Sequence, residues 1–296
     1  MVLVVGATGL LGSEVCRRLI ARGLPVRALV RPTADVARID QLRALGATLV
    51  VGDLRDRESL DAACRGTTTV ISTATSLIPH QEGDSIADAD RDGQMELVDA
   101  ARAAGVGQFI YISYSGNHAV PSPLYAAKRG VEQHLRESGV PYTILRPAPF
   151  MEIWFSPALG FDYGRGAAQI YGAGERPVSW ISLADVAQFA VDCVGNPAAE
   201  NAVIELGGPE AVSPLEAVRT FEEVTGRRFE LQYVPEPALA AQWESAEDPT
   251  QKSFAALTLG VARGDAIDMR HTLETFPRRL TSVRDYAAST TSPPAA

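Results

Sequence analysis

Three glycines near the start of the chain have the spacing of a phosphate-binding turn. Gly6, Gly9 and Gly12 follow a strand-like apolar run at residues 2–5 and lead into an amphipathic helical pattern. The first glycine allows a tight turn, the second lets backbone N–H groups approach a pyrophosphate, and the third lets helix and strand pack closely. A second apolar run follows at residues 26–30. This context predicts a dinucleotide-binding βαβ unit rather than an ordinary glycine turn.

The residue after the second apolar run bears on the choice of cofactor. An NAD enzyme usually has Asp or Glu there to bind the ribose 2′-hydroxyl, whereas this chain has Arg31. A guanidinium fits a 2′-phosphate through its charge and its forked hydrogen bonds. Asp35 lies too far along the chain to take the acidic role. The sequence therefore predicts NADP(H), and the alternative interpretation of Arg31 is a solvated surface arginine.

Strands and helices alternate through the first half of the chain. The apolar runs are residues 2–5, 26–30, 48–51, 69–72, 108–112 and 142–145, and helical patterns separate them. This alternation is typical of a parallel sheet covered on both faces, with ligands at the carboxyl ends of the strands. After Arg146 the composition changes to proline, glycine and aromatic residues.

These patterns predict an α/β fold, a Rossmann-type doubly wound parallel sheet with a smaller C-terminal substrate lobe. We expect residues 1–150, joined by about 176–206, to form the NADP-binding domain. Residues 151–286 would form the substrate lobe, and residues 287–296 a disordered tail.

Composition narrows the class of protein. The formal charge of −9 opposes binding to nucleic acid or to an anionic membrane. The apolar runs are only strand-length and the first begins at once, so neither a membrane span nor a signal peptide is expected. Cys16, Cys64 and Cys193 lack metal-ligand spacing and are expected to be small buried residues. The sequence therefore predicts a cytoplasmic protein, a monomer or a homodimer.

Five segments spread over residues 1 to about 286 carry a family resemblance: GATGLLG, VISTATS, DGQMELVDAARAAGVGQFIYIS, TILRPAPFM and WISLADVA. Together they resemble the extended and atypical short-chain dehydrogenase/reductase superfamily, in particular its NmrA-like, isoflavone-reductase-like branch. The resemblance implies cofactor-binding roles for Gly6, Thr8, Gly9, Leu10, Leu11, Gly12, Arg31, Asp53, Leu54, Thr73, Ala74, Thr75, Lys128 and Pro149. Asp53 is equally interpretable as a turn residue or a helix cap.

The resemblance also implies catalytic positions. In typical members a serine polarises a carbonyl, a tyrosine supplies a proton, and a lysine four residues later holds the nicotinamide ribose. Ser113 and Lys128 match the serine region and the lysine position, but Leu124 occupies the tyrosine position. Tyr125 is one residue away, which on a helix is a rotation of about 100°. Tyr125 is thus a candidate donor or a packing aromatic, and Lys128 a cofactor ligand or a solvated lysine.

The loop after the fifth apolar run contains two more candidate proton donors, Tyr114 and His118. Histidine titrates near neutral pH and can donate a proton, although a lone loop histidine is more often a surface residue. The remaining histidines, His80, His134 and His271, lack the spacing of a metal site or a catalytic triad. We therefore expect no metal.

Aromatic residues are concentrated after the sixth apolar run. The group consists of Phe150, Met151, Trp154, Phe155, Phe161 and Tyr163, and its members are expected to form either a pocket wall or the lobe core. The predicted function is NADPH-dependent hydride transfer to an apolar, aromatic or quinone-like carbonyl or activated alkene. The alternatives are a non-catalytic NADP(H)-binding redox sensor of the NmrA type and an assembly factor that keeps the nucleotide for stability.

Overall fold

The computed structural model describes residues 1–77 and 83–291. The chain divides into two compact units. The first unit consists of Met1–Ser113, Pro123–Arg146 and Val186–Ile204, and the second unit of Tyr114–Ser122, Pro147–Asp185 and Glu205–Ala296. His80 and residues 292–296 of the expected tail lie outside the described residues.

A seven-stranded sheet organises the first unit. Its order is β3-β2-β1-β4-β5-β6-β9, and the pairings from β3 to β6 are all parallel. The strands are β1 (Val2–Val5), β2 (Val26–Val30), β3 (Thr48–Val51), β4 (Thr69–Ser72), β5 (Gln108–Ile112), β6 (Tyr142–Pro147) and β9 (Ala202–Leu206). The strand order reverses between β1 and β4. An α/β sheet of this kind binds ligands at this point of reversal, beside the carboxyl ends of the strands. The predicted Rossmann-type fold is confirmed.

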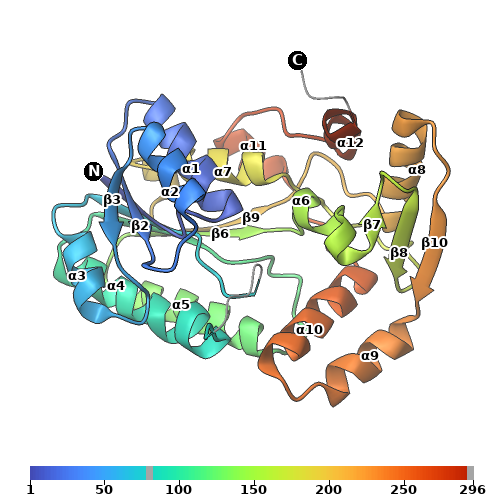
Figure 1. Ribbon diagram of the computed structural model, residues 1–296, viewed down its shortest axis with the longest axis horizontal. Helices are drawn as coiled ribbons and strands as arrows, with labels where there is room; N and C mark the ends of the chain where they lie inside the picture. Colours follow the sequence, from blue (N-terminus) through green and yellow to red (C-terminus); the bar gives the residue numbers. More distant parts are fainter. Residues whose placement is uncertain (78–82, 292–296) are drawn as a thin grey trace. The chain divides into compact units, whose positions relative to one another are not determined.

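Helices cover both faces of this sheet. They are α1 (Leu10–Ala21), α2 (Val36–Ala44), α3 (Arg57–Cys64), the π-helical η1 (Ile86–Asp92), α4 (Gly93–Ala103), α5 (Pro123–Glu137), α7 (Leu183–Asp192) and the short η3 (Pro197–Ala199). Figure 1 shows α1, α2 and α7 on one face and α3, α4 and α5 on the other. Both faces of the central strands are thus buried: all four residues of β1 are apolar, and all four residues of β4, Thr69 and Ser72 included, are buried.

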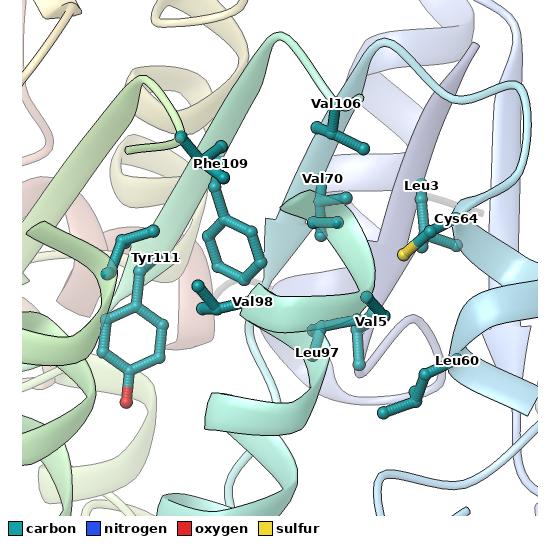
Figure 2. Close-up of a cluster of buried hydrophobic side chains, with 14 of the residues drawn as sticks. Leu3, Val5, Leu60, Cys64, Val70, Leu97, Val98, Val106, Phe109 and Tyr111 are labelled. Carbon is teal, nitrogen blue, oxygen red and sulfur yellow. The ribbon is translucent and has the colours of Figure 1, made fainter. Parts of the chain in front are cut away.

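The core of the first unit lies between the sheet and helices α3 and α4. Figure 2 shows side chains of β1, β4 and β5 packed against those of the two helices. They include Leu3, Val5, Val70, Phe109, Tyr111, Leu60, Cys64, Leu97 and Val98, each at most 1% exposed. Burying one such apolar side chain contributes about 1.5–3 kcal/mol, so this core holds the strand ends in fixed positions.

The three cysteines are buried free thiols, as predicted. Cys16, Cys64 and Cys193 have no disulfide partner in the described residues. Burial raises the pKa of Cys64 to about 11 and those of Cys16 and Cys193 to about 12. At neutral pH these thiols stay protonated and are unsuited to nucleophilic chemistry.

A smaller sheet, of order β10-β8-β7, organises the second unit. Its strands are β7 (Phe161–Asp162), β8 (Ala167–Tyr171) and β10 (Glu230–Val234); β8 pairs with β10 in parallel and with β7 antiparallel. The helices are α6 (Met151–Trp154), η2 (Pro157–Leu159), α8 (Pro214–Thr225), α9 (Glu236–Ser245), α10 (Pro249–Arg263), α11 (Arg270–Thr275) and α12 (Val283–Thr291).

The aromatic segment after β6 contributes mainly to the core of the second unit. Met151, Phe155 and Phe161 are at most 5% exposed and pack with Phe221, whose ring centroid lies 4.9 Å from that of Phe161. Trp154 is only partly buried against the same core, as is Tyr163. The lobe-core interpretation therefore holds for the three buried side chains.

The expectation of a disordered tail is wrong for residues 287–291. The tail is helical as far as Thr291, because α12 packs Ala287 at 0% exposure, so residues 287–291 are not disordered. In residues 1–77 and 83–291, no helix has the length and apolarity needed to cross a membrane. Within the same residues, no three potential metal-ligating side chains come together.

Candidate functional site

The turn between β1 and α1 needs glycine at two positions for reasons of packing. Gly6 has a φ of +81°, and an added Cβ would lie 2.7 Å from Thr73 Oγ1 and 2.8 Å from the backbone nitrogen of Ala74. A Cβ on Gly12 would lie 2.1 Å from the carbonyl oxygen of Gly6. Both contacts are far shorter than van der Waals distance, so the fold itself excludes larger residues at positions 6 and 12.

Gly9 differs from these two glycines. Its φ is −76°, and an added Cβ would meet only the Gly6 carbonyl oxygen, at 3.2 Å. Gly9 is the N-cap of α1, and it provides no side-chain cap in a first turn without acidic residues. The first N–H groups of a helix lack intrahelical partners and carry partial positive charge, so they attract phosphate. A Cβ at position 9 would be tight but less crowded than at positions 6 and 12, and the approach of a phosphate to Gly9 stays a prediction.

The other residues of the turn have mixed surroundings. The carbonyl oxygen of Thr8 accepts a hydrogen bond from Arg38 Nη1 at 2.6 Å. Leu11 is buried, whereas the Leu10 side chain is 53% exposed. Exposure of a leucine beside an open helix N-terminus leaves an apolar surface next to the proposed phosphate site.

Arg31 follows β2 and is held by a carboxylate. Its Nη1 lies 2.9 Å from both carboxylate oxygens of Asp84. The Arg31 side chain is 31% exposed and that of Asp84 only 7% exposed. Arg31 is thus an ion-paired, partly exposed arginine, and its contact with a 2′-phosphate stays a prediction. A 2′-phosphate at this position would have to share the guanidinium with Asp84 or displace it.

Two further arginines lie in the same region, and sequence analysis missed both. Arg38 in the first turn of α2 reaches the glycine turn through Thr8, and Arg55 after β3 lies 2.9 Å from Asp53 Oδ2. The Arg55 guanidinium holds the pKa of Asp53 below its usual range. The sequence feature that could have identified Arg38 is its position in the first turn of α2, the helix that follows Arg31. Three guanidinium groups thus lie around the ends of β2 and β3.

Asp53 forms a turn rather than a cap. Its Oδ1 accepts a hydrogen bond from the backbone N–H of Arg55 at 2.9 Å, and the cap of α3 is Asp56. The turn interpretation holds, whereas the contact of Asp53 with adenine stays a prediction. Leu54 packs beside the start of α4, where an added Cβ on Gly93 would lie 2.7 Å from Leu54 Cβ.

The exit of β4 lies against the glycine turn. Thr73 Oγ1 donates to the carbonyl oxygen of Val5 at 3.1 Å, and Gln94 Nε2 donates to that of Ala74 at 3.3 Å. Thr75 Oγ1 accepts from the backbone N–H of Leu77 at 3.4 Å. These contacts bring the predicted cofactor segment, residues 73–75, next to Gly6, where the strand order reverses. The role of Pro149 stays a prediction; its carbonyl oxygen accepts from Ile181 N–H at 3.1 Å.

Lys128 is buried within the first unit. Its side chain is 6% exposed, and Nζ lies 3.4 Å from Asp90 Oδ1 and 5.2 Å from the ring centroid of Tyr111. The alternative interpretation of Lys128 as a solvated helix lysine is therefore wrong. Its cofactor contact stays a prediction.

Ser113, which directly follows β5, belongs to a charged network with residues of α5 and β6. Its Oγ donates to Glu132 Oε1 at 2.6 Å, and Arg146 Nε donates to the same oxygen at 3.0 Å. Burial acts to raise the pKa of Glu132, but hydrogen bonds from Arg146 and Ser113, together with the charge of Arg129, outweigh burial and lower it. The Ser113 proton is engaged by a carboxylate, so polarising a carbonyl would require this hydrogen bond to change.

Tyr125 and Lys128 have different surroundings. The Tyr125 ring is half-buried and lies 5.2 Å from Arg129 Cζ, whereas Lys128 lies against Asp90 and Tyr111. Leu124, in the usual tyrosine position, is buried at 5% exposure. Tyr125 thus has a packing role beside Arg129, and its role as proton donor stays a prediction.

His118 is buried within the second unit. Its Nε2 lies 3.0 Å from Asp265 Oδ2, at ion-pair distance, and the side chains are 6% and 0% exposed. Asp265 Oδ1 accepts hydrogen bonds from Ser115 Oγ and Asn117 Nδ2, at 2.7 and 2.9 Å. The surface interpretation of His118 is therefore wrong. The Tyr114 ring lies edge-on to His118, with a centroid distance of 6.3 Å; the donor roles of both stay predictions.

Comparison with known proteins agrees with this arrangement. The model described as "NmrA-like family" matches residues 1–274. The chain is 34% identical over 232 residues to an NAD(P)H azoreductase of Xenophilus azovorans, covering 77% of this chain and 74% of that protein. It is 31% identical over 281 residues to the isoflavone reductase homolog IRL of Zea mays, covering 89% and 87%.

One further comparison concerns the fold, and another concerns a relative whose name describes a different role. An NADPH-dependent quinone oxidoreductase (QOR2) of Escherichia coli, solved with NADPH, shares the fold with a TM-score of 0.80 and 24% identity, covering 99% of this chain and all of that chain. A photosystem II assembly factor, Ycf39 of Trieres chinensis, is 29% identical over 238 residues, covering 79% of this chain and 72% of that protein.

Proposed function

This chain belongs to the NmrA-like family, and from that premise we propose that it is an NADPH-dependent reductase of the atypical short-chain dehydrogenase/reductase class. The observation that carries the proposal is the uncapped N-terminus of α1 at Gly9, beside the exit of β4. A pyrophosphate bound there would accept hydrogen bonds from the backbone and gain from the helix dipole.

The arginines around β2 and β3 support NADPH as the cofactor. Arg31, Arg38 and Arg55 place three guanidinium groups here, although nearby carboxylates, Asp84 and Asp53 among them, already pair with Arg31 and Arg55. A 2′-phosphate dianion would be attracted to these guanidinium groups and could take two hydrogen bonds from them. The name of the quinone oxidoreductase, which specifies NADPH, agrees with this choice, and the name of the azoreductase, which specifies NAD(P)H, is compatible with it.

The chain itself would contribute binding and orientation. Gly6, Gly9 and Gly12 would hold the pyrophosphate, Arg31 the 2′-phosphate, and Lys128 the nicotinamide ribose. The bound cofactor supplies the hydride. Ser113, Tyr114, Tyr125 and His118 remain the candidate groups for placing a carbonyl or moving a proton.

We propose an apolar substrate with a conjugated carbonyl or activated alkene, such as a quinone or an aromatic ketone. Phe150, Trp154 and Tyr163 are the partly exposed members of the aromatic segment that remain available to contact such a ring. The proposed location is the cytoplasm, where buried thiols stay reduced. The printed names of the relatives, an azoreductase and an isoflavone reductase homolog, support a conjugated substrate.

A non-catalytic NADP(H)-binding regulator is the second candidate. Two observations favour it: Leu124 occupies the usual tyrosine position, and one relative is a photosystem II assembly factor. In this case the nucleotide would set the conformation of a surface that binds a partner protein.

An oxidation assay separates the two candidates. The protein is incubated with NADPH and a panel of quinones, aromatic ketones, enones and azo dyes, and the loss of NADPH absorbance is followed. We expect oxidation of NADPH that depends on both protein and acceptor. If NADPH binds in a fluorescence titration but no acceptor is reduced, the reductase proposal fails and the regulator remains. If NADPH does not bind, both fail.

A further inference from the structure

Asp90 is a buried carboxylate to which the proposed function assigns no role. Its side chain is 0% exposed. Oδ2 accepts hydrogen bonds from the backbone N–H and the Oγ of Ser76, at 2.9 and 2.6 Å. Within residues 1–77 and 83–291, Oδ1 has no hydrogen-bond partner, and it lies 3.4 Å from Lys128 Nζ. Burying a carboxylate costs free energy unless a cation or several hydrogen-bond donors compensate for its lost hydration. Asp90 therefore requires such partners at this buried position.

The backbone around Asp90 has an unusual conformation, and the Asp90 side chain is buried. Asp90 lies in η1, a π-helical segment whose two buried residues are Ile86 and Asp90. π-Helical turns are rare and are found most often at functional sites. The position next to Ile86 on the inward face would ordinarily hold an apolar side chain. A charged residue there indicates selection for its charge rather than for packing.

Lys128 is fixed from two sides by its neighbours. The carboxylate of Asp90 lies on one side of Nζ, and the ring of Tyr111 lies 5.2 Å from it. An ammonium group near an aromatic ring gains a further electrostatic attraction. The flexible lysine side chain therefore has one favoured position in the described part of the first unit.

Ser76 connects this ion pair to the exit of β4. The residue lies directly after segment 73–75, whose carbonyl and hydroxyl groups contact Gln94 and Val5. Asp90 thus joins the ammonium group of α5 to the strand exit that borders the glycine turn. Displacement of the carboxylate would release both Nζ and the Ser76 backbone.

We propose that Asp90 is a positioning residue that, held by Ser76, keeps the charged Lys128 ammonium at the nicotinamide end of the cofactor site. The inference rests on the proposed function, because it assigns Asp90 a purpose only if Lys128 contacts the nucleotide. Asp90 itself touches neither cofactor nor substrate and acts through Lys128.

A double-mutant cycle of Asp90→Asn and Lys128→Met tests this role. For each of the four proteins we would measure the NADPH dissociation constant, and kcat and KM with the best acceptor of the panel. Asp90→Asn should lower kcat about tenfold and weaken NADPH binding less, by under about threefold. In the Lys128→Met background the same substitution should change kcat by less than about twofold.

The outcomes separate positioning from general structural damage. Equal losses of kcat from Asp90→Asn in both backgrounds would overturn the role, because the carboxylate would then act independently of the lysine. Ser76→Ala should give a smaller loss than Asp90→Asn, since the Ser76 backbone N–H still holds Oδ2. Asp192→Asn is the matched control: this partly buried carboxylate on α7 pairs with Arg22, and its substitution should leave kcat unchanged.

The measurements also distinguish failure of this inference from failure of the proposed function. If wild-type protein binds NADPH but reduces no acceptor, the reductase proposal fails. The coupling between Asp90 and Lys128 is then measured from the NADPH dissociation constants of the four proteins. Asp90→Asn should weaken NADPH binding only when Lys128 is present. Absence of coupling in that measurement overturns the inference. Wild-type protein that does not bind NADPH overturns both the cofactor assignment and the purpose assigned to Asp90.

Discussion

The two units treat their buried carboxylates differently. In the first unit, Asp90 lies beside Lys128 and Glu132 accepts hydrogen bonds from Arg146, so each carboxylate has a permanent cation. In the second unit, Asp265 accepts hydrogen bonds from Ser115 and Asn117 and lies beside a histidine. Glu152, also in the second unit, accepts hydrogen bonds from backbone N–H groups, that of Leu183 at 3.0 Å from both carboxylate oxygens.

The pKa shifts of the two glutamates show what this difference does. Burial acts on both to raise the pKa, but hydrogen bonds and charge from arginines lower that of Glu132 overall. Burial raises the pKa of Glu152, helped by the charge of Asp185, and backbone N–H groups do not outweigh it. Cations thus keep buried charge ionised in the unit that contains the glycine turn, whereas neutral donors leave a carboxyl in the second unit easier to protonate.

Removing the carboxylate of the paired glutamate should have the largest effect. We expect Glu132→Gln to lower the free energy of unfolding by about 3 kcal/mol at neutral pH, because Arg146 and Arg129 lose their counter-charge. The folded-state pKa of Glu132 lies below its unfolded value, so its contribution is present above the unfolded pKa and is lost as pH falls through the folded pKa. Urea unfolding at neutral and acidic pH would measure both effects.

Glu152→Gln is the matched test in the second unit. Because the folded-state pKa of Glu152 is raised, its protonated form favours folding, and that contribution is lost as pH rises through the folded pKa. The variant should therefore unfold within about 1 kcal/mol of wild type at neutral pH, since Gln can still accept the Leu183 N–H. Equal destabilisation by the two variants would contradict the comparison between the units.

The second prediction tests whether the glycine turn of the first unit binds the nucleotide. Gly9→Val should weaken NADPH binding more than about a hundredfold, near 2.7 kcal/mol, because a branched side chain would fill the space over the helix N-terminus. The protein should still fold, with a modestly lower melting temperature, because the added Cβ makes one tight contact, at 3.2 Å from the Gly6 carbonyl oxygen. Gly107→Ala is the control, with ordinary contact at 3.5 Å, and should bind normally. Unchanged affinity in Gly9→Val would make the turn purely structural.

The third prediction concerns the carboxylate that opposes Arg31. Wild type should bind NADPH about ten- to a hundredfold more tightly than NADH, since a charge-assisted hydrogen bond contributes about 1.5–3 kcal/mol. Arg31→Asp should reverse or abolish this preference. Asp84→Asn should increase it, because the guanidinium at 2.9 Å would no longer be shared. Calorimetric titrations with both nucleotides provide the test, and equal wild-type affinities would refute the role of Arg31.

Strands and the glycine turn could be predicted because their signals are local. The six predicted apolar runs coincide with β1 to β6, β6 extending to Pro147, since each is a short run rich in apolar residues next to a helix. β9 was not identified as a strand: it has the last place in the sheet order, its burial alternates, and Val203 is 37% exposed. An edge strand of this kind lacks the continuous apolar run of a central one.

The partners of the charged residues could not be predicted because they come from distant parts of the chain. Ser115 and Asp265 are 150 positions apart, and nothing local marks His118 as buried. Asp90 stands in an acidic stretch that is typical of a solvated helix face, and only the π-helical turn directs it inward. Arg31 was identified from its position after β2, but its partner Asp84 follows a different strand. The sequence thus predicted which residues belong to the site more easily than their protonation states and their ion-pair or hydrogen-bond partners.

The smallest expected effect is that of Tyr125→Phe, which tests the register of α5. Tyr125 lies beside Arg129, whereas Lys128 lies against Asp90, so the hydroxyl is not in the position of the usual proton donor. We expect Tyr125→Phe to lower kcat by less than about tenfold, that is, under about 1.4 kcal/mol. Steady-state kinetics of this variant beside Lys128→Ala would compare the two faces of the helix, and the lysine variant should lose far more activity. Loss of all turnover in Tyr125→Phe would mean that the hydroxyl supplies the proton despite its register, and the cation-paired first unit would then contain the donor as well as the cofactor.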